Sequence, residues 1–171
     1  EERERAAAVR ALLDRADAVA ANGHLSDARS TLEQALELEP ESELVEHKLS
    51  ETHRLQAEGY RRRGDISRAR MHYHASLELD PGNLPSRRGL SEIQTALERQ
   101  RQRRQRIEIL MERGRTLMSK EQWKDAYDTF SEIIELDAEN DTVQELLRQG
   151  RNGVNESHLA AGVLGQAERK L

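Results

Sequence analysis

Residues 65–81 read DISRARMHYHASLELDP, and residues 24–40 read HLSDARSTLEQALELEP. Both stretches carry an alanine at the same place, and both end in two leucines, an acid and a proline. Every matched pair of residues has the same offset along the chain as Pro40 and Pro81. The chain therefore contains an internal repeat, which predicts an array of similar structural units.

A third copy ends at Ala138, at a larger offset from Pro81. In each copy an alanine precedes a large apolar residue by four positions, which is a helical spacing. The three pairs are Ala28 and Leu32, Ala69 and Tyr73, and Ala126 and Phe130. A small residue at a fixed place in a helix lets a neighbouring helix come close. We therefore expect Ala69 and Ala126 to be buried where paired helices touch.

Another run with helical spacing precedes each copy, again with a small residue at one equivalent position. These small residues are Ala16, Ala57 and Gly114. Gly23 and Gly64 follow the first two runs, where the C-terminus of a helix needs a left-handed residue. The third copy has Glu121 at this place. The predicted unit is a helix, a tight turn, a second helix and a turn marked by proline.

This unit resembles the tetratricopeptide (TPR) repeat, whose pattern is W-x2-L-G-x2-Y, then A-x3-F, then P. The resemblance covers about residues 8–40, 49–81 and 106–138. It implies an all-α fold, a TPR-like superhelical solenoid of helix-turn-helix repeats in a single domain over residues 1–171. The departures are the Trp position, the missing proline of the third copy, and copies that lie farther apart than in the family. The Trp position holds Leu12, His53 and Leu110.

The extra length before the third copy, residues 82–105, predicts an extended helix between the second and third repeats. Pro85 and Ser86 suit a helix start, and no proline or glycine follows from Leu90 to Arg113. We expect one helix from Ser86 to about Ser119, roughly 50 Å long at about 1.5 Å per residue. A break within residues 100–104 is the alternative.

Residues 139–171 predict either a partial fourth repeat or capping helices. A first helix over residues 141–148 would end in a turn at Asn152-Gly153. The apolar spacing of the tail then repeats that of a first TPR helix. Its residues are Val163, Leu164, Ala167 and Leu171. If its second helix is missing, part of this stripe faces solvent and predicts self-association through the C-terminal helix.

The composition excludes several classes of protein. Hydrophobic residues make up 36% and aromatic residues 3%, which suits Ala- and Leu-rich helices with wide solvated faces. The net charge of −5 disfavours nucleic-acid binding, and the absence of cysteine rules out disulfides. No membrane-spanning run or signal peptide is visible, and the chain opens on Glu1 like a segment of a longer protein. The compartment stays open between cytoplasm and periplasm, with an anchor outside this sequence as an alternative, and the composition suggests a bacterial source.

No catalytic or metal-binding pattern is present, so we expect no enzyme, cofactor, metal or small-molecule substrate. The sequence lacks the phosphate-binding loop, the dinucleotide fingerprint and the H-E-x-x-H motif. His72 and His74 are two positions apart, so on a helix they point in opposite directions and cannot share a metal.

In the TPR family the first helices of the units line a concave groove that holds peptides. By that resemblance the main groove residues are Arg10, Leu13, Asp17, Arg54, Glu58, Arg61, Arg62, Met111, Arg115 and Met118. Further groove positions hold Asp14, Glu51, Leu55, Glu108 and Glu112. One branch of the family grips a terminal carboxylate with Lys and Asn at some of these positions. That clamp is absent here, which disfavours a heat-shock co-chaperone.

The resemblance implies a scaffold that binds a protein or peptide partner in the groove. One alternative is a structural or oligomerisation module of a larger bacterial assembly, with or without association with a membrane. Another is binding of an acidic partner or RNA by residues 98–106, which contain five arginines. For an acidic partner we expect the groove arginines to act, because linker arginines such as Arg101 and Arg104 diverge around the helix. The groove arginines concerned are Arg54, Arg61 and Arg62.

Overall fold

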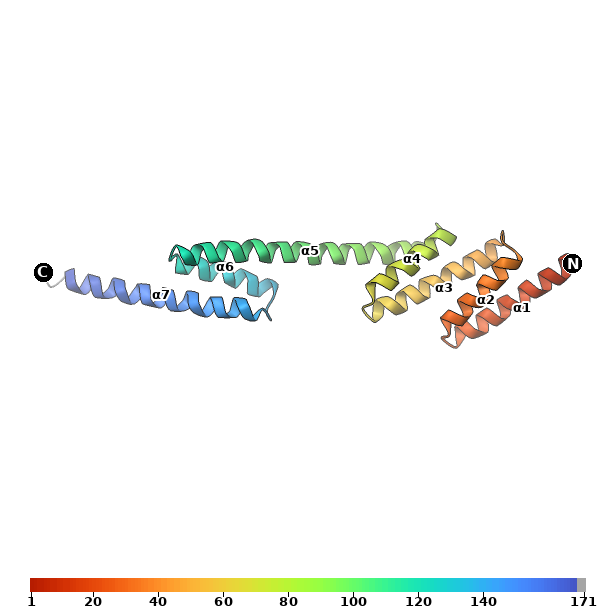
Figure 1. The fold of residues 1–171 in the computed structure, drawn as a ribbon, viewed down its shortest axis with the longest axis horizontal. Helices are drawn as coiled ribbons and strands as arrows, with labels where there is room; N and C mark the ends of the chain where they lie inside the picture. The colour runs from red at the N-terminus through yellow and green to blue at the C-terminus, as the bar shows by residue number, and fades with distance from the viewer. Residues whose placement is uncertain (169–171) are drawn as a thin grey trace. The chain divides into compact units, whose positions relative to one another are not determined.

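The computed structural model describes the backbone of residues 1–168 and the side chains of residues 1–160. This part of the chain forms seven helices and no strand (Figure 1). The helices are α1 (Glu2–Ala21), α2 (Leu25–Leu38), α3 (Glu43–Arg62), α4 (Ile66–Leu79), α5 (Leu84–Ser119), α6 (Trp123–Leu136) and α7 (Asp141–Glu168). The predicted all-α, TPR-like array of helix-turn-helix repeats is confirmed, including the extended helix between the second and third repeats. That helix, α5, is unbroken through residues 100–104.

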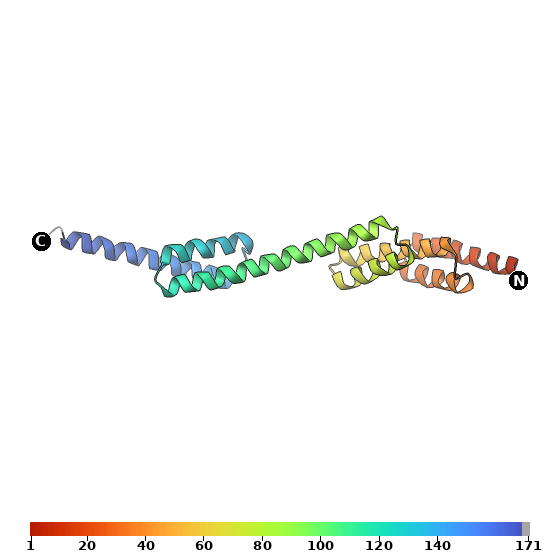
Figure 2. The same cartoon turned by 90° about the horizontal axis from the view of Figure 1, so that it is seen from above.

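The chain divides into two compact units, Glu1–Leu97 and Glu98–Leu171. The first unit holds α1 to α4 and the first part of α5, and the second holds the rest of α5 with α6 and α7 (Figures 1 and 2). None of the described helices combines the length and the apolar character that crossing a membrane requires.

Small residues of the first helix of each repeat lie against large residues of the second. Ala16 packs with Leu32, and Ala57 packs with Tyr73. In the third repeat, a Cβ atom added to Gly114 would lie 2.4 Å from Cε1 of Phe130, so only glycine allows this approach. These three contacts hold each pair of helices together. Ala69 and Ala126 are fully buried, as predicted.

The turn inside each repeat needs a residue with left-handed backbone conformation. Gly23 and Gly64 have φ angles of 83° and 79°, as the sequence predicts. Glu121 takes the same place in the third repeat, with a φ of 58°. A residue with a Cβ atom in this conformation costs about 1–2 kcal/mol, so the third turn is strained where the first two are not.

The helices that follow the second and third repeats begin in the same way. The side-chain Oδ1 of Asn83 accepts a hydrogen bond from the backbone N–H of Ser86 at 3.0 Å, near the start of α5. Oδ1 of Asn140 accepts from the N–H of Val143 at 3.2 Å, near the start of α7. The two asparagines occupy equivalent positions of the second and third copies, so α7 begins in the register of α5.

A chain of buried hydroxyl groups fixes the start of α5 on the second repeat. Oγ of Ser76 lies 2.9 Å from Oγ of Ser50 and 2.8 Å from Oγ of Ser86. Nδ2 of Asn83 donates to Oγ of Ser50 at 3.1 Å. Because all four residues are buried, these hydrogen bonds link α3, α4 and α5 without exposure to water.

The predicted turn at Asn152-Gly153 is wrong, because α7 continues through both residues. Gly153 is present for another reason: an added Cβ atom would lie 2.2 Å from Cδ2 of Trp123. The glycine lets the indole ring lie directly against α7. The residues on which the fourth-repeat prediction depends lie outside the described side chains; they are Val163, Leu164, Ala167 and Leu171.

The first part of α5 and the described part of α7 present polar residues where the other first helices present packing residues. The packing positions in the first repeat are Val9, Leu12, Ala16 and Val19. The same register positions in α5 hold Ser91, Gln94, Glu98 and Arg101, and in α7 they hold Arg148, Arg151, Asn155 and His158. All eight are exposed. A polar outer face is typical of capping helices, and the choice between capping helices and a partial fourth repeat stays a prediction.

Candidate partner-binding face

In the first unit, α1 and α3 carry the predicted groove residues. Nζ of Lys48 on α3 lies 2.7 Å from Oδ1 of Asp17 on α1, so this ion pair joins the two helices. Arg10 and Arg62 are exposed, and Leu13 is half-buried. The first unit therefore brings the groove residues of α1 and α3 onto neighbouring helices.

Arg54, predicted to meet a partner, is already held by two carboxylates of its own helix. Its Nε donates to Oε2 of Glu51 at 2.9 Å, and its Nη1 donates to Oε1 of Glu58 at 2.6 Å. Burial alone would lower the pKa of Arg54, but the hydrogen bond to Glu51 and the charges of both carboxylates outweigh it and raise the pKa. The positive charge of Arg54 is thus already neutralised by Glu51 and Glu58, and it attracts an acidic ligand only weakly.

Arg61 is paired as well, with a residue of the next helix. Its Nη1 donates to Oε2 of Glu92 at 2.7 Å, while Arg88 donates to the other carboxylate oxygen at 3.1 Å. The hydrogen bond from Arg61, followed by that from Arg88, lowers the pKa of Glu92. Arg62 has no carboxylate partner among the described residues. The face of the first unit is therefore largely compensated in charge.

An apolar side chain lies among these ion pairs. Leu55, next to Arg54 on α3, is 37% exposed. Because Arg54 is fixed by two hydrogen bonds, the polar surroundings of this leucine are ordered before any ligand binds. This gives the face one apolar contact point within a polar frame.

The groove residues of the second unit are more apolar. Met111 and Met118 of α5 are half-buried and pack against the cluster around Leu110 and Phe130, whereas Arg115 is exposed. Both methionines thus belong partly to the core, and less of their surface is open to a ligand than the sequence suggested.

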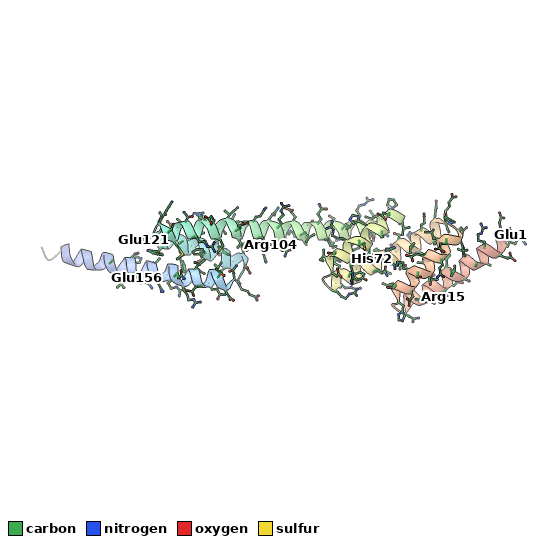
Figure 3. All side chains as sticks on the ribbon, viewed as in Figure 1. Glu1, Arg15, His72, Arg104, Glu121 and Glu156 are labelled. Carbon is green, nitrogen blue, oxygen red and sulfur yellow. The ribbon has the colours of Figure 1, made fainter. Side chains whose placement is uncertain are left out.

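A pair of histidines lies between α3 and α4, and sequence reasoning missed it. Nδ1 of His53 lies 3.0 Å from Nδ1 of His72 (Figure 3 labels His72), and the ring of Tyr60 stacks on His72 at 5.2 Å. Burial, then the nearby His72 and Arg29, lower the pKa of His53 to about 4. Burial and Arg29 also lower the pKa of His72. No third histidine or carboxylate joins them to form a metal site among the described residues.

Two further residues of the face were missed, and one could have been found. Glu92 has the same offset from Glu51 as Pro81 has from Pro40, so it occupies in α5 the position that Glu51 occupies in α3. Extending the repeat register into α5 would have placed it on the groove side. Lys48 lies between the buried Val45 and Leu49 of α3, and no pattern in the sequence signals its pairing with Asp17.

The second unit also has a surface hollow of about 410 Å³ between the start of α6 and α7. Trp123 and Val154 form its apolar part, and Lys124 and His158 lie at its edge. Its remaining lining residues, Glu121, Gln122, Asp125 and Ser157, are polar.

No family model and no curated protein matches this chain. Among solved structures, the chain is similar to one described as the TPR2AB-domain:pHSP90-complex of yeast Sti1, with 19% identity and a TM-score of 0.41. That similarity covers 85% of this chain and 58% of the other, so this chain spans little more than half of the Sti1 chain's length. A second structure is described as the first TPR of Spaghetti (RPAP3) bound to HSP90 peptide SRMEEVD. It is 11% identical, with a TM-score of 0.30 and coverage of 86% and 96% of the two chains.

The repeats are TPR-like. Their own geometry supports this description, namely the paired helices, the small residue against the large one and the left-handed turn.

Proposed function

We propose that this chain is a protein–protein interaction scaffold in which the α1 and α3 face of the first unit binds a partner segment. The observation that carries the proposal is Leu55, exposed within a set of fixed ion pairs. An ordered face loses little conformational freedom when it binds, so more of the contact energy appears as affinity. This is a binding function and not a catalytic one.

The chemistry of the face indicates the kind of segment. Because Arg54 and Arg61 are already paired, the centre of the face does not favour a strongly acidic ligand. We expect an apolar side chain on Leu55, flanked by groups that hydrogen-bond to the carboxylates around it. Arg10 and Arg62 at the two ends remain exposed for charged contacts.

A photo-crosslinking amino acid in place of Leu55 tests this proposal. The matched control places it at Met71, which is 58% exposed on α4, a second helix of its repeat. We expect position 55 to crosslink a discrete partner from native lysate and position 71 to crosslink none. Purified partner should then bind the wild-type chain and fail to bind Leu55→Asp, with the melting temperature unchanged. Equal crosslinking from both positions contradicts the proposal.

Residues 98–106 support a second candidate, the binding of an acidic partner to α5. Every residue of this segment is exposed, including Arg104 (Figure 3). Arg106 pairs with Glu132 at 3.2 Å, while the other four arginines of the segment have no carboxylate partner among the described residues. Replacing Arg101 and Arg104 by Glu, and testing the partner captured through Leu55, separates the two candidates. Loss of binding only in this variant favours the linker.

The remaining alternative is a structural role in a larger assembly. It predicts that the chain self-associates or co-purifies as a stoichiometric subunit, whereas a scaffold binds a segment reversibly. The mass measured by light scattering at several concentrations distinguishes them. A mass that rises with concentration, and that Leu159→Glu lowers, supports the structural role.

A further inference from the structure

The turn between α3 and α4 carries a concentration of arginine that the other repeats lack. Residues 61–70 read RRRGDISRAR, with five arginines and one aspartate, a net charge of +4. The equivalent residues 20–29 and 118–127 each have equal numbers of basic and acidic residues. Because all three turns have the same fold, the charge of the second turn is not a requirement of the repeat.

Stability of the helices does not explain these arginines either. Arginines in the last turn of α3 interact favourably with the negative end of the helix dipole. Arg68, however, lies in the first turn of α4, where the positive end of the dipole opposes a cation. Asp65 offsets part of this, with its Oδ2 lying 3.5 Å from Nε of Arg68, and so does the ring of Tyr60, whose centre lies 5.5 Å from the guanidinium carbon. A feature that works against the helix indicates another role.

Arg63 at the end of α3 and Arg68 at the start of α4 lie over the ring of one tyrosine. The guanidinium carbon of Arg63 lies 4.8 Å from the centre of the Tyr60 ring, and that of Arg68 lies 5.5 Å from it. Tyr60 is itself held by stacking on His72. Arg63 and Arg68 are both exposed, and Arg63 has no carboxylate partner among the described residues. Arg70 is exposed too, but it lies two positions after Arg68 and points to the other side of α4. The two arginines over Tyr60 therefore form an ordered positive surface at the turn.

We propose that the α3–α4 turn is a second docking surface, which binds an acidic segment of a partner protein. The surface lies at the end of the repeat, so this inference does not depend on binding at Leu55. Charge complementarity identifies the ligand: a run of carboxylates pairs with guanidinium groups through strong, often bidentate hydrogen bonds.

A short acidic segment fits better than a nucleic acid. The whole chain carries a net charge of −5, so a long polyanion would extend from the turn onto acidic surface. A short segment experiences only the local charge, because the Debye length is about 8 Å at physiological salt. Tyr60 is half-buried and covered by its neighbours, so no aromatic face is open for stacking a base.

A fluorescent peptide of ten glutamates is the probe, titrated with the whole chain at physiological salt. Arg63→Gln with Arg68→Gln should weaken its binding about 3- to 10-fold, the loss of two exposed ion pairs. The control, Arg3→Gln with Arg5→Gln, removes the same charge from α1 of the same unit and should leave the affinity within about twofold. Both variants should have the same melting temperature as the wild type. Leu55→Asp should bind the peptide as the wild type does, which separates this surface from the groove.

Three results would overturn the proposal. Equal binding of the peptide by both double variants would mean that charge alone, without the turn, decides the affinity. A single-stranded DNA of the same charge that binds more tightly than the peptide would assign the surface to nucleic acid. Self-association of the wild type that disappears in Arg63→Gln with Arg68→Gln would make a second copy of the chain the ligand.

Discussion

The two halves of α5 have the same helical backbone, but the residues at matched repeat positions are apolar and buried in one half and polar and exposed in the other. In the second half, Leu110 is buried and Gly114 lies against Phe130, so this half acts as the first helix of a repeat. In the first half the corresponding positions hold Gln94 and Glu98, both exposed. The first half packs on the repeat before it through Leu90 and Ile93 and caps the first unit. A few positions on one face therefore decide whether a helix continues a repeat array or ends it.

The largest effect should come from the matched positions Leu110 and Gln94. We expect Leu110→Ala to destabilise the second unit by about 2–5 kcal/mol, because it leaves a cavity beside Phe130. Gln94→Ala should change stability by less than about 0.5 kcal/mol, since its side chain is exposed. Urea denaturation of both variants measures the difference. Equal losses would show that both halves of α5 are packed alike.

Enlarging the buried alanines should have the next largest effect. Ala69→Leu and Ala126→Leu insert three heavy atoms where the two helices of a repeat touch, and should each cost about 1–3 kcal/mol. Thermal melting followed by circular dichroism provides the measurement. Melting temperatures that match the wild type in both variants would mean that the alignment of the repeats is wrong.

Because the turn of the third repeat is strained, relieving the strain should increase the stability of the second unit. Glu121→Gly removes a Cβ atom from a residue with φ of 58°, and should stabilise the second unit by about 1 kcal/mol. Gly64→Ala adds a Cβ atom at the equivalent place in the first unit and should destabilise it by about the same amount. Shifts in the urea midpoint test both. A loss of stability in Glu121→Gly would indicate that the glutamate makes a compensating contact.

The smallest effect should come from the histidine pair, which only the first unit has. The pKa of His53 is about 4 in the folded chain against an ordinary value of 6.5. Between these values the unfolded chain takes up a proton and the folded chain does not, so stability is full above pH 6.5 and falls as the pH drops toward 4. The loss is modest because His53 is only half-buried, and solvent screens the charge that it gains.

Hydrogen exchange of α3 and α4 at pH 7.5 and pH 5 measures this loss, with α6 as the internal reference. His53→Gln with His72→Gln should remove the part of the acid sensitivity that is specific to the first unit. If the double variant shows the same difference between α3 and α6 as the wild type, the pair is not its cause.

The fold could be read from the sequence because the repeat positions are local. Alanine four positions before a large apolar residue, and glycine after the first run, each predict a contact or a turn within one hairpin. The turn predicted at Asn152-Gly153 failed because a glycine serves two purposes, and only the position of Trp123 distinguishes them. The signal for the start of α7 was present in Asn140, which matches Asn83 in the repeat register.

The candidate site was less accessible to sequence reasoning, because charge pairing is decided between helices. Arg54 and Arg61 were expected to face a partner, and both are paired within the first unit, the second of them with Glu92 from the following helix. The histidine pair joins two side chains from different helices in a way that no periodicity records. The sequence alone, however, already shows that the turn inside the second repeat carries a net positive charge and that the turns inside the first and third repeats do not.

The exposed arginines of residues 98–106 also make α5 a site for cleavage by trypsin. Trypsin cleaves after arginine, and this segment offers five such bonds at exposed residues, of which Arg106 is paired with Glu132 on α6. A protease needs an extended chain, so only the hydrogen bonds of the helix itself protect these bonds, and their opening is local. The first cuts should therefore fall here and divide the chain between its two units. The rate of that cleavage measures how often the middle of α5 unwinds.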